Sequence, residues 1–230
     1  MKTKIFILLT ALSFSTAVFA QDAKTVDEGV IINGVKWATR NVAAPGTFAD
    51  KPEDPGMLYQ WNRKVGWSAT GPMVNSNGGT DWDITAPEGE NGTWEKANDP
   101  CPAGWRIPTP EELQELIDSG SEQKIIDSGS KGKRKKETGV NGRIFGSGSN
   151  TIFLPATNSR KYDSWVKRFI LHDKKGNGVL IADDGFGSYW SNSRYYEKAF
   201  YLYFNSDRAG MGSNNRVIDM LSCRCVAEKD

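Results

Sequence analysis

The clearest helical pattern in the chain is a single short segment, and this limits the folds that the chain can adopt. In Thr109–Glu112, a threonine precedes a proline at the first helical position and a glutamate at the third, which is the pattern of a capped helix start. Leu113, Leu116 and Ile117 then recur at helical spacing. The sequence therefore predicts one clear helix near 109–118 that buries one face.

Most of the remaining chain consists of short β-rich runs separated by turn residues. Val30–Ile32 and Val35–Ala38 flank Asn33-Gly34, which is typical of a tight hairpin turn. The other strand-like runs lie mainly in the second half; they are 142–145, 151–154, 169–172, 178–181, 189–192, 199–204 and 221–226. The residues 43–56 are expected to be a loop, and the residues 118–136 are polar. This order predicts an α+β domain dominated by antiparallel sheet.

The first twenty residues have the pattern of a secretory signal peptide. A basic start precedes an apolar run from Ile5 to Phe14, and small residues suited to a signal peptidase end at Ala20. The alternative, an N-terminal membrane anchor, needs a longer apolar run. We expect cleavage after Ala20, a flexible N-terminus over 21–29, a single domain over 30–228, and no integral membrane segment in the exported protein.

The composition bears on several classes of function. Lys and Arg number 29 against 28 Asp and Glu, so the net charge gives no reason to expect nucleic acid as a partner. The single histidine, His172, excludes a multi-histidine metal site and leaves one residue for any Ser-His-Asp arrangement. We predict no metal and no cofactor. The basic run Lys131–Lys136 is interpreted as a solvated loop rather than as a site for an anionic ligand.

Export permits disulfides, and the chain has three cysteines, Cys101, Cys223 and Cys225. Each possible pairing leaves one thiol over. A bridge between Cys223 and Cys225 would close a tight, strained ring, so we expect Cys101 to pair with one of the two. The alternatives are three small buried side chains, or a CxC metal or redox site that lacks companion His or Cys ligands.

Seven segments together resemble one protein family. They are 34–42, 58–61, 98–109, 141–143, 152–156, 187–192 and 225–226. The most specific is Cys101–Thr109, which reads Cys-Pro-Ala-Gly-Trp-Arg-Ile-Pro-Thr. Over roughly 30–228 the chain resembles the Fibrobacter succinogenes major paralogous domain family of exported bacterial proteins, which is related to C-type-lectin-like folds.

The resemblance implies a C-type-lectin-like fold with a mostly antiparallel sheet, long irregular loops and a bridge between Cys101 and Cys225. Cys223 stands where that family usually has an apolar residue. Ligands of such folds often bind the loops between the C-terminal strands, here about Thr157–Gly187. The calcium motifs of sugar-binding members do not occur, and the nearest oxygen-rich groups, Asp183-Asp184 and Asn205–Asp207, are interpreted as solvated turns.

The segment from Asn62 to Asn98 is unusual, because it is rich in Gly, Ser, Thr and Asn and yet contains three tryptophans. A loop of this length is usually functional or disordered, and the tryptophans in it indicate that part of it packs. Sugars can stack on exposed aromatic rings while neighbouring polar side chains bind their hydroxyl groups. The sequence therefore yields a candidate ligand-binding group, which consists of Arg63, Trp67, Asp81, Trp82 and Asp83. The alternative is that Trp67, Trp82 and Trp94 fill the core, as expected for Trp37, Trp61, Trp105 and Trp190.

Three classes of function follow. We favour an exported binding or adhesion module for glycan or protein ligands, in the periplasm, on the bacterial surface or secreted. The first alternative is a structural or accessory surface component without a ligand site. The second is an enzyme related to formylglycine-generating oxidases, which share the broader fold and need a reactive cysteine pair, so that Cys223 would have to be exposed. No catalytic residues are predicted.

Overall fold

The computed structural model describes residues 25–87, 89, 92–127, 139–157, 159–163, 168–171 and 185–229. Several features named above lie outside these residues. They are the predicted signal peptide 1–20, the basic run Lys131–Lys136, His172, the predicted strand 178–181 and Asp183-Asp184. In the described part of the chain, no helix is long and apolar enough to cross a membrane.

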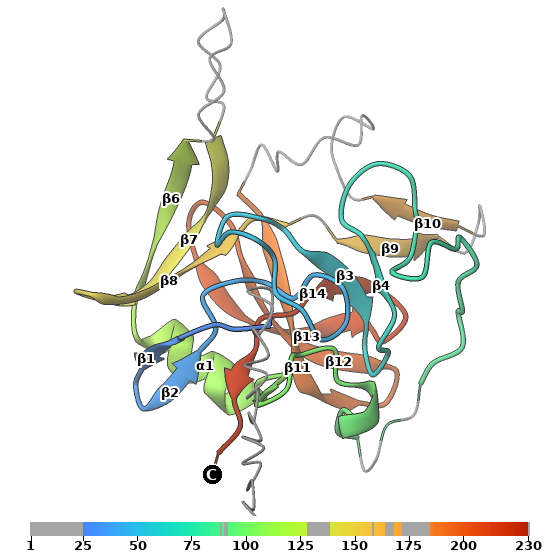
Figure 1. Cartoon of the computed structure of the whole chain (residues 1–230), viewed down its shortest axis with the longest axis horizontal. Helices are drawn as coiled ribbons and strands as arrows, with labels where there is room; N and C mark the ends of the chain where they lie inside the picture. The colour runs from blue at the N-terminus through green and yellow to red at the C-terminus, as the bar shows by residue number, and fades with distance from the viewer. Residues whose placement is uncertain are drawn as a thin grey trace, which may run out of the picture.

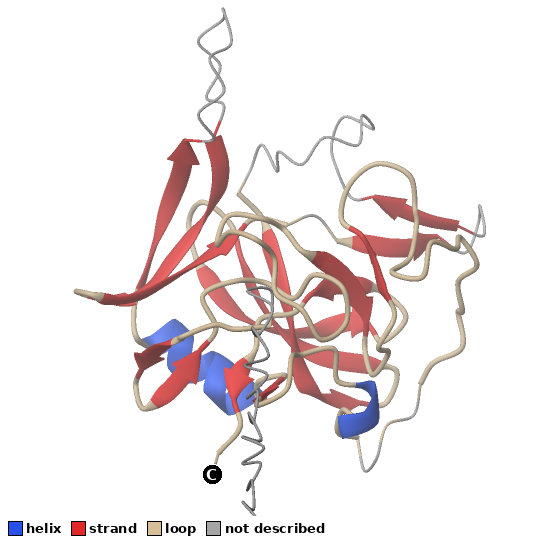
Figure 2. Ribbon diagram, in the orientation of Figure 1, coloured by secondary structure: helices blue, strands red, loops and turns tan. Residues whose placement is uncertain are grey.

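The described residues form three sheets and one α-helix (Figure 2), which confirms the predicted α+β class with mostly antiparallel sheet. One short 3-10 helix, Lys96–Asn98, also occurs among them. Within the described ranges, every strand pairing is antiparallel except that of β11 with β14, where Tyr189 is opposite Ser222.

The first sheet joins the start of the domain to its end. Its strand order is β1–β2–β15–β5, and the strands are β1 (Val30–Ile32), β2 (Val35–Trp37), β15 (Val226–Ala227) and β5 (Trp105–Arg106). The predicted hairpin is confirmed, because β1 and β2 pair antiparallel and the turn residues Asn33 and Gly34 have φ of 49° and 81°. Val226 is opposite both Trp37 and Arg106, so β15 lies inside the sheet.

The second sheet has eight strands among the described residues. Its main order is β10–β9–β14–β11–β12–β13, and β3 pairs with both β14 and β4. The strands are β3 (Met57–Gln60), β4 (Gly66–Ser68), β9 (Arg160–Asp163), β10 (Arg168–Leu171), β11 (Gly187–Tyr195), β12 (Lys198–Phe204), β13 (Ala209–Arg216) and β14 (Met220–Ser222). Figure 1 shows this sheet at the centre of the molecule.

Two details of this sheet differ from the sequence prediction. The predicted strand around Phe169 pairs with β9, whose residues are not strand-like in the sequence. The predicted strand 221–226 is divided: Met220–Ser222 belongs to the second sheet and Val226–Ala227 to the first. The residues between them, 223–225, cross from one sheet to the other, and this crossing is what interrupts the strand.

The third sheet has the order β6–β7–β8, with β6 (Ser121–Asp127), β7 (Gly139–Ser147) and β8 (Asn150–Pro155). The β6–β7 pair projects from the body of the molecule (Figure 1). The sequence analysis predicts no strand among the polar residues 118–136, but residues 121–127 form one. They form a strand because each of them is paired with a residue of β7, from Ser121 opposite Phe145 to Asp127 opposite Gly139.

The predicted helix is confirmed as α1 (Pro110–Asp118). The Thr109 hydroxyl accepts the Glu112 N–H at 3.2 Å, and the Glu112 carboxylate accepts the Thr109 N–H at 2.9 Å, which completes a capping box. Arg106 donates two hydrogen bonds to the same carboxylate, at 2.8 and 2.6 Å. Leu113 and Leu116 face the core. The cap therefore fixes the helix start against β5.

The crossover at 223–225 binds several segments together. Cys225 forms the disulfide with Cys101 that the family resemblance implied, across 124 residues of sequence. The fully buried Arg224 donates to Asn41 Oδ1 at 2.7 and 3.0 Å and to the carbonyls of Ala38 and Phe153 at 3.1 and 3.0 Å. Burial lowers the pKa of Arg224 to about 10, so the guanidinium stays protonated at neutral pH.

Removal of the disulfide should destabilise the fold. We expect Cys101→Ala/Cys225→Ala to lower the free energy of unfolding by roughly 2–5 kcal/mol, because the unfolded chain regains the freedom of a long closed loop. Urea unfolding under non-reducing conditions measures the change. Reduction of the wild type should produce the same shift and should not shift the double variant further. An unchanged midpoint in the double variant would contradict a structural role for the bridge.

The capping carboxylate should make stability depend on pH. Burial favours the protonated form, but the hydrogen bonds from Arg106 and from the Thr109 N–H prevail and hold the pKa of Glu112 below its usual value. Such a group stabilises the fold above its unfolded pKa, and the contribution is lost as the pH falls through the folded pKa.

The unfolding midpoints of the wild type and Glu112→Gln should therefore differ at about pH 7, and the difference should disappear as the pH falls through the folded pKa of Glu112. Urea unfolding at a series of pH values measures this. Glu115→Gln, an exposed position on the same helix, is the control and should follow the wild type. A difference that stays constant down to acid pH would show that the charge of Glu112 does not matter.

Candidate binding surface

The segment after β3 is held on the body of the protein by buried polar side chains. Gln60 is buried, and its amide donates to the carbonyls of Asp83 at 2.8 Å and Ile218 at 3.0 Å. Because Ile218 precedes β14, this side chain joins the irregular segment directly to the central sheet. The backbone around Asp83 therefore has a fixed place on the surface.

Asn62 fixes the end of the same segment. Its side-chain oxygen accepts the Glu95 N–H at 2.8 Å, and its amide donates to the Glu95 carboxylate at 3.3 Å. Asn62 has a φ of 55°, a left-handed conformation that asparagine tolerates better than most residues. Gln60 and Asn62 therefore hold the polar segment on the body of the protein at two points, Asp83 and Glu95.

Two of the three tryptophans of this segment are core residues. Trp67 is opposite Leu58 in the β3–β4 pair, packs in a cluster with Leu58 and Met220, and is 3% exposed. Trp94 packs against Trp61 with ring centroids 5.6 Å apart. The prediction that Trp67 offers a stacking ring is corrected, because strand pairing turns this ring inward. Trp37, Trp61, Trp105 and Trp190 are buried, as expected.

Trp82 differs from these two rings. It packs against the cluster of Trp67 and Met220 but remains partly exposed. Its main chain lies next to Asp83, whose carbonyl is the one held by Gln60. Trp82 is therefore the ring of the 62–98 segment that both has a fixed base and reaches the surface.

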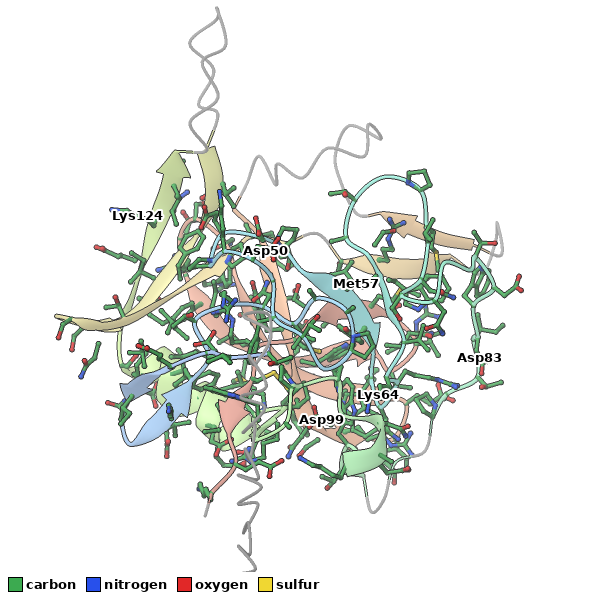
Figure 3. The ribbon with its side chains drawn as sticks, in the orientation of Figure 1. Asp50, Met57, Lys64, Asp83, Asp99 and Lys124 are labelled. Atoms are coloured by element: carbon green, nitrogen blue, oxygen red, sulfur yellow. A yellow bond between two sulfur atoms is a disulfide. The ribbon has the colours of Figure 1, made fainter. Side chains whose placement is uncertain are left out.

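Asp83, the residue directly after Trp82, forms an ion pair with Arg63. Arg63 Nη2 lies 2.9 Å from Asp83 Oδ2 and donates to the carbonyl and hydroxyl of Thr85 at 3.1 and 2.9 Å. The Thr85 N–H donates to Asp83 Oδ1 at 2.7 Å, and the hydrogen bonds from Thr85, with the charge of Arg63, hold the pKa of Asp83 below its usual value. Asp83 lies at the periphery of the molecule, on the opposite side of the view from Lys124 (Figure 3).

The structure thus brings together three of the five predicted site residues, which are Arg63, Trp82 and Asp83. Asp81 is exposed and takes no part in these contacts, and Trp67 is in the core. We call Arg63, Trp82, Asp83 and Thr85 the Trp82 surface. It combines a partly exposed aromatic ring with an ion pair that involves the next residue of the chain. Aromatic rings can bind a sugar by stacking, and charged side chains can bind its hydroxyls by hydrogen bonds.

The sequence prediction does not include a second exposed aromatic group, at the β11–β12 turn. Tyr195 and Tyr196 are 67% and 77% exposed. Next to them, the guanidinium of Arg194 lies over the Trp61 ring at 5.5 Å and donates to the Pro87 carbonyl at 2.8 Å. The sequence pattern that could have revealed this group is a pair of tyrosines directly after a strand-like run. The pair is followed by an acidic and a basic residue, Glu197 and Lys198.

The free thiol is inaccessible. Cys223 is fully buried, and burial raises its pKa well above the usual value. It therefore lacks the exposure that the oxidase hypothesis requires of it. Within the described residues, no group of three or more His, Cys, Asp or Glu side chains is placed to hold a metal ion. Asn205 uses its side-chain oxygen to accept the N–H groups of Asp207 and Arg208, as in a turn.

Comparisons of the chain with protein-family models, with curated proteins and with solved structures find no match. The family and the function are therefore inferred from the residues and from the geometry described above.

Loss of the Gln60 anchor should loosen the Trp82 surface. In Gln60→Ala, the Asp83 carbonyl loses its buried donor, so we expect faster chymotrypsin cleavage after Trp82. Limited proteolysis with mass spectrometry of the fragments measures the rate at that bond. Gln114→Ala, on the exposed face of α1, is the control and should not change it. An unchanged rate in Gln60→Ala would mean that the surface is held by other contacts.

Proposed function

We propose that the chain is an exported binding or adhesion module that binds glycan or protein ligands on irregular loops. The observation that carries this proposal is the Trp82 surface, where a partly exposed ring is followed directly in the chain by Asp83, which pairs with Arg63 on a segment anchored by Gln60. Binding sites are commonly placed on loops that a rigid scaffold positions. A loop fixed in advance loses less freedom when it binds, so even a shallow surface gains useful affinity.

We further propose that the chain is a member of the Fibrobacter succinogenes major paralogous domain family with a C-type-lectin-like fold. The most specific motif, Cys101–Thr109, supports this by the structural use of its residues. Cys101 is bridged to Cys225, Trp105 packs against Phe48, and Thr109 caps the helix. Asp99, directly before this motif, accepts the Cys101 and Ile107 N–H groups at 2.9 and 3.0 Å.

Export is proposed from two independent features. The N-terminal residues 1–20 have the pattern of a signal peptide. The disulfide between Cys101 and Cys225 needs an oxidising compartment to form and persist. The periplasm, the outer surface of the bacterium and the medium all meet this condition.

The chemistry of the Trp82 surface suits glycan ligands. The apolar face of a sugar ring would lie on the exposed part of Trp82, and its hydroxyls would bind the charged side chains of Arg63 and Asp83. An arginine has five N–H donors. The contacts with Asp83 and Thr85 use the Nη2 group, and Nε is buried without a hydrogen-bond partner among the described residues, so the Nη1 group provides the donors for a ligand. No metal ion is needed for this mode of binding.

The proposal predicts loss of binding when the ring or the cation is removed. We expect Trp82→Ala and Arg63→Ala to bind a polysaccharide at least about tenfold more weakly than the wild type, since each removes one of few contacts. Tryptophan fluorescence titration against a panel of polysaccharides measures the affinity, and EDTA should not change it.

Lys64→Ala is the matched control for Arg63→Ala, because Lys64 is an exposed cation next to it in the chain. It should bind like the wild type, and the melting temperatures of all variants should be close. A wild type that binds nothing in the panel would favour a structural or accessory component. Equal losses in Arg63→Ala and Lys64→Ala would indicate unspecific charge attraction rather than a site.

A further inference from the structure

The β11–β12 turn carries the two most exposed large hydrophobic side chains of the described residues. Tyr195 is the last residue of β11 and is 67% exposed, and Tyr196 in the turn is 77% exposed. Two adjacent exposed rings form a continuous apolar area that folding leaves in contact with water. Such area marks an interaction site more often than an isolated exposed residue does.

The backbone of this turn is unfavourable for the residue that it carries. Tyr196 has a φ of 54°, and the other non-glycine residues with positive φ in the described part are both asparagines, Asn33 and Asn62. The left-handed conformation is tolerated by asparagine and costs free energy for a bulky residue. Since the Tyr196 ring is exposed, packing does not compensate for this cost. A tyrosine that has an unfavourable backbone conformation and an exposed ring indicates a function at the surface.

The two rings are held in a defined arrangement. Their centroids are 4.5 Å apart and their planes meet at 78°, so the edge of one ring contacts the face of the other. The turn is closed by pairing of Tyr195 with Lys198 and of Arg194 with Ala199. The rings therefore stand on a closed hairpin rather than on a free loop.

The base of the hairpin is joined to two neighbouring segments. The Arg194 N–H donates to the Gly92 carbonyl at 2.9 Å, and its guanidinium donates to the Pro87 carbonyl and lies over the buried Trp61 ring. On the other side, the Val217 N–H donates to the Glu197 carbonyl at 2.9 Å. These contacts arrange the two rings before a ligand arrives, which reduces the cost of binding.

The chemistry around the rings favours an uncharged ligand with both apolar and hydroxyl surface. Glu197 and Lys198 are exposed beside the tyrosines and carry opposite charges. Of the nearby cations, Arg194 is turned to the Pro87 carbonyl and the Trp61 ring, and Arg216 lies 3.6 Å from Asp219. The exposed tip of the turn therefore has no net charge to attract an anionic glycan. Pyranose rings have apolar faces that stack on tyrosine, and their hydroxyls can bind the phenol groups and these two charged side chains. Because the rings stand on a turn, an extended chain or a polysaccharide surface fits better than a single sugar.

We propose that Tyr195 and Tyr196 form a second glycan-contacting surface, which binds neutral polysaccharides built of pyranose units. The proposal rests on the glycan-binding function proposed above and adds a substrate class and two residues to it. It assigns the ligand-stacking role to rings outside the 62–98 segment. The Trp82 surface then contributes additional contacts rather than the whole site.

The test is depletion of the protein from solution by insoluble neutral polysaccharides, namely cellulose, chitin, xylan and mannan. The variants are Tyr196→Asn, Tyr195→Ser/Tyr196→Asn and Trp82→Ala. Phe186→Ser is the control, because Phe186 is an exposed aromatic residue outside the turn. We expect the double variant to bind at least about tenfold more weakly and Phe186→Ser to bind like the wild type.

Stability separates loss of a contact from loss of the fold. Asparagine suits the left-handed backbone, so Tyr196→Asn should melt at the same temperature as the wild type or above it, while it binds more weakly. Weaker binding with an unchanged or raised melting temperature supports the proposal, because damage to the fold would lower both.

Three results would overturn the proposal. If the double variant binds like the wild type while Trp82→Ala does not, glycan binding stands and the tyrosine surface is wrong. If Phe186→Ser weakens binding as much as the double variant does, the interaction is general adhesion of exposed rings. If the wild type binds none of the four polysaccharides, both the tyrosine surface and glycan binding fail, and a protein ligand becomes the better hypothesis.

Discussion

The fold depends on the way in which the last strand-forming residues cross between two sheets. Met220–Ser222 lies in the second sheet against β3, β9 and β11, and Val226–Ala227 lies inside the first sheet. Between them, Arg224 is buried and donates hydrogen bonds to oxygens of Asn41, Ala38 and Phe153, and it has no carboxylate as a hydrogen-bond partner among the described residues. A buried cation that loses such acceptors costs several kcal/mol, so these segments are held in one arrangement. The disulfide between Cys225 and Cys101 joins the segment that precedes α1 to this crossover.

Several elements of this fold can be predicted from the sequence because they depend on interactions between residues close together in the chain. The Asn33-Gly34 turn and the helix at Thr109 depend on residues within a few positions of each other, and both form as predicted. The strand at Ser121–Asp127 is missed, because its polar residues become a strand through pairing with β7. The division of 221–226 is missed for a related reason. The residue pattern of a strand-like run does not show that its two halves pair with different sheets. The bridge partner of Cys101 follows from the family resemblance, whereas the cysteine count alone leaves Cys223 and Cys225 open.

The candidate site is predicted in part for the same physical reason. Trp67 and Trp82 have similar polar surroundings in the sequence, but Trp67 is turned inward by pairing with β3 and Trp82 is not. The association of Arg63 with Asp83 follows from the buried Gln60, which is an unremarkable residue in the sequence. Tyr195 and Tyr196 read as the end of a strand, and a positive φ at Tyr196 is visible only in the structure. The Tyr195–Tyr196 turn connects two strands of the central sheet, and Gln60 anchors the Trp82 surface to that sheet. A rigid crossover that holds the sheet in place therefore also holds both surfaces in place.

Amide hydrogen exchange of the full oxidised chain tests most directly whether the crossover holds the two sheets together. The N–H groups of Ala38 and Val42 donate to the carbonyls of Cys225 and Cys223, and the Trp61 N–H donates to Val217 just before β14. The account predicts that these amides exchange only through global unfolding, with the same opening free energy as urea unfolding of the whole protein. Exchange of Ala38 and Val42 at a much lower free energy, while the strands β11 and β12 stay protected, would contradict it. The C-terminal residues could then detach from the rest of the protein, and the central sheet would be stable without them.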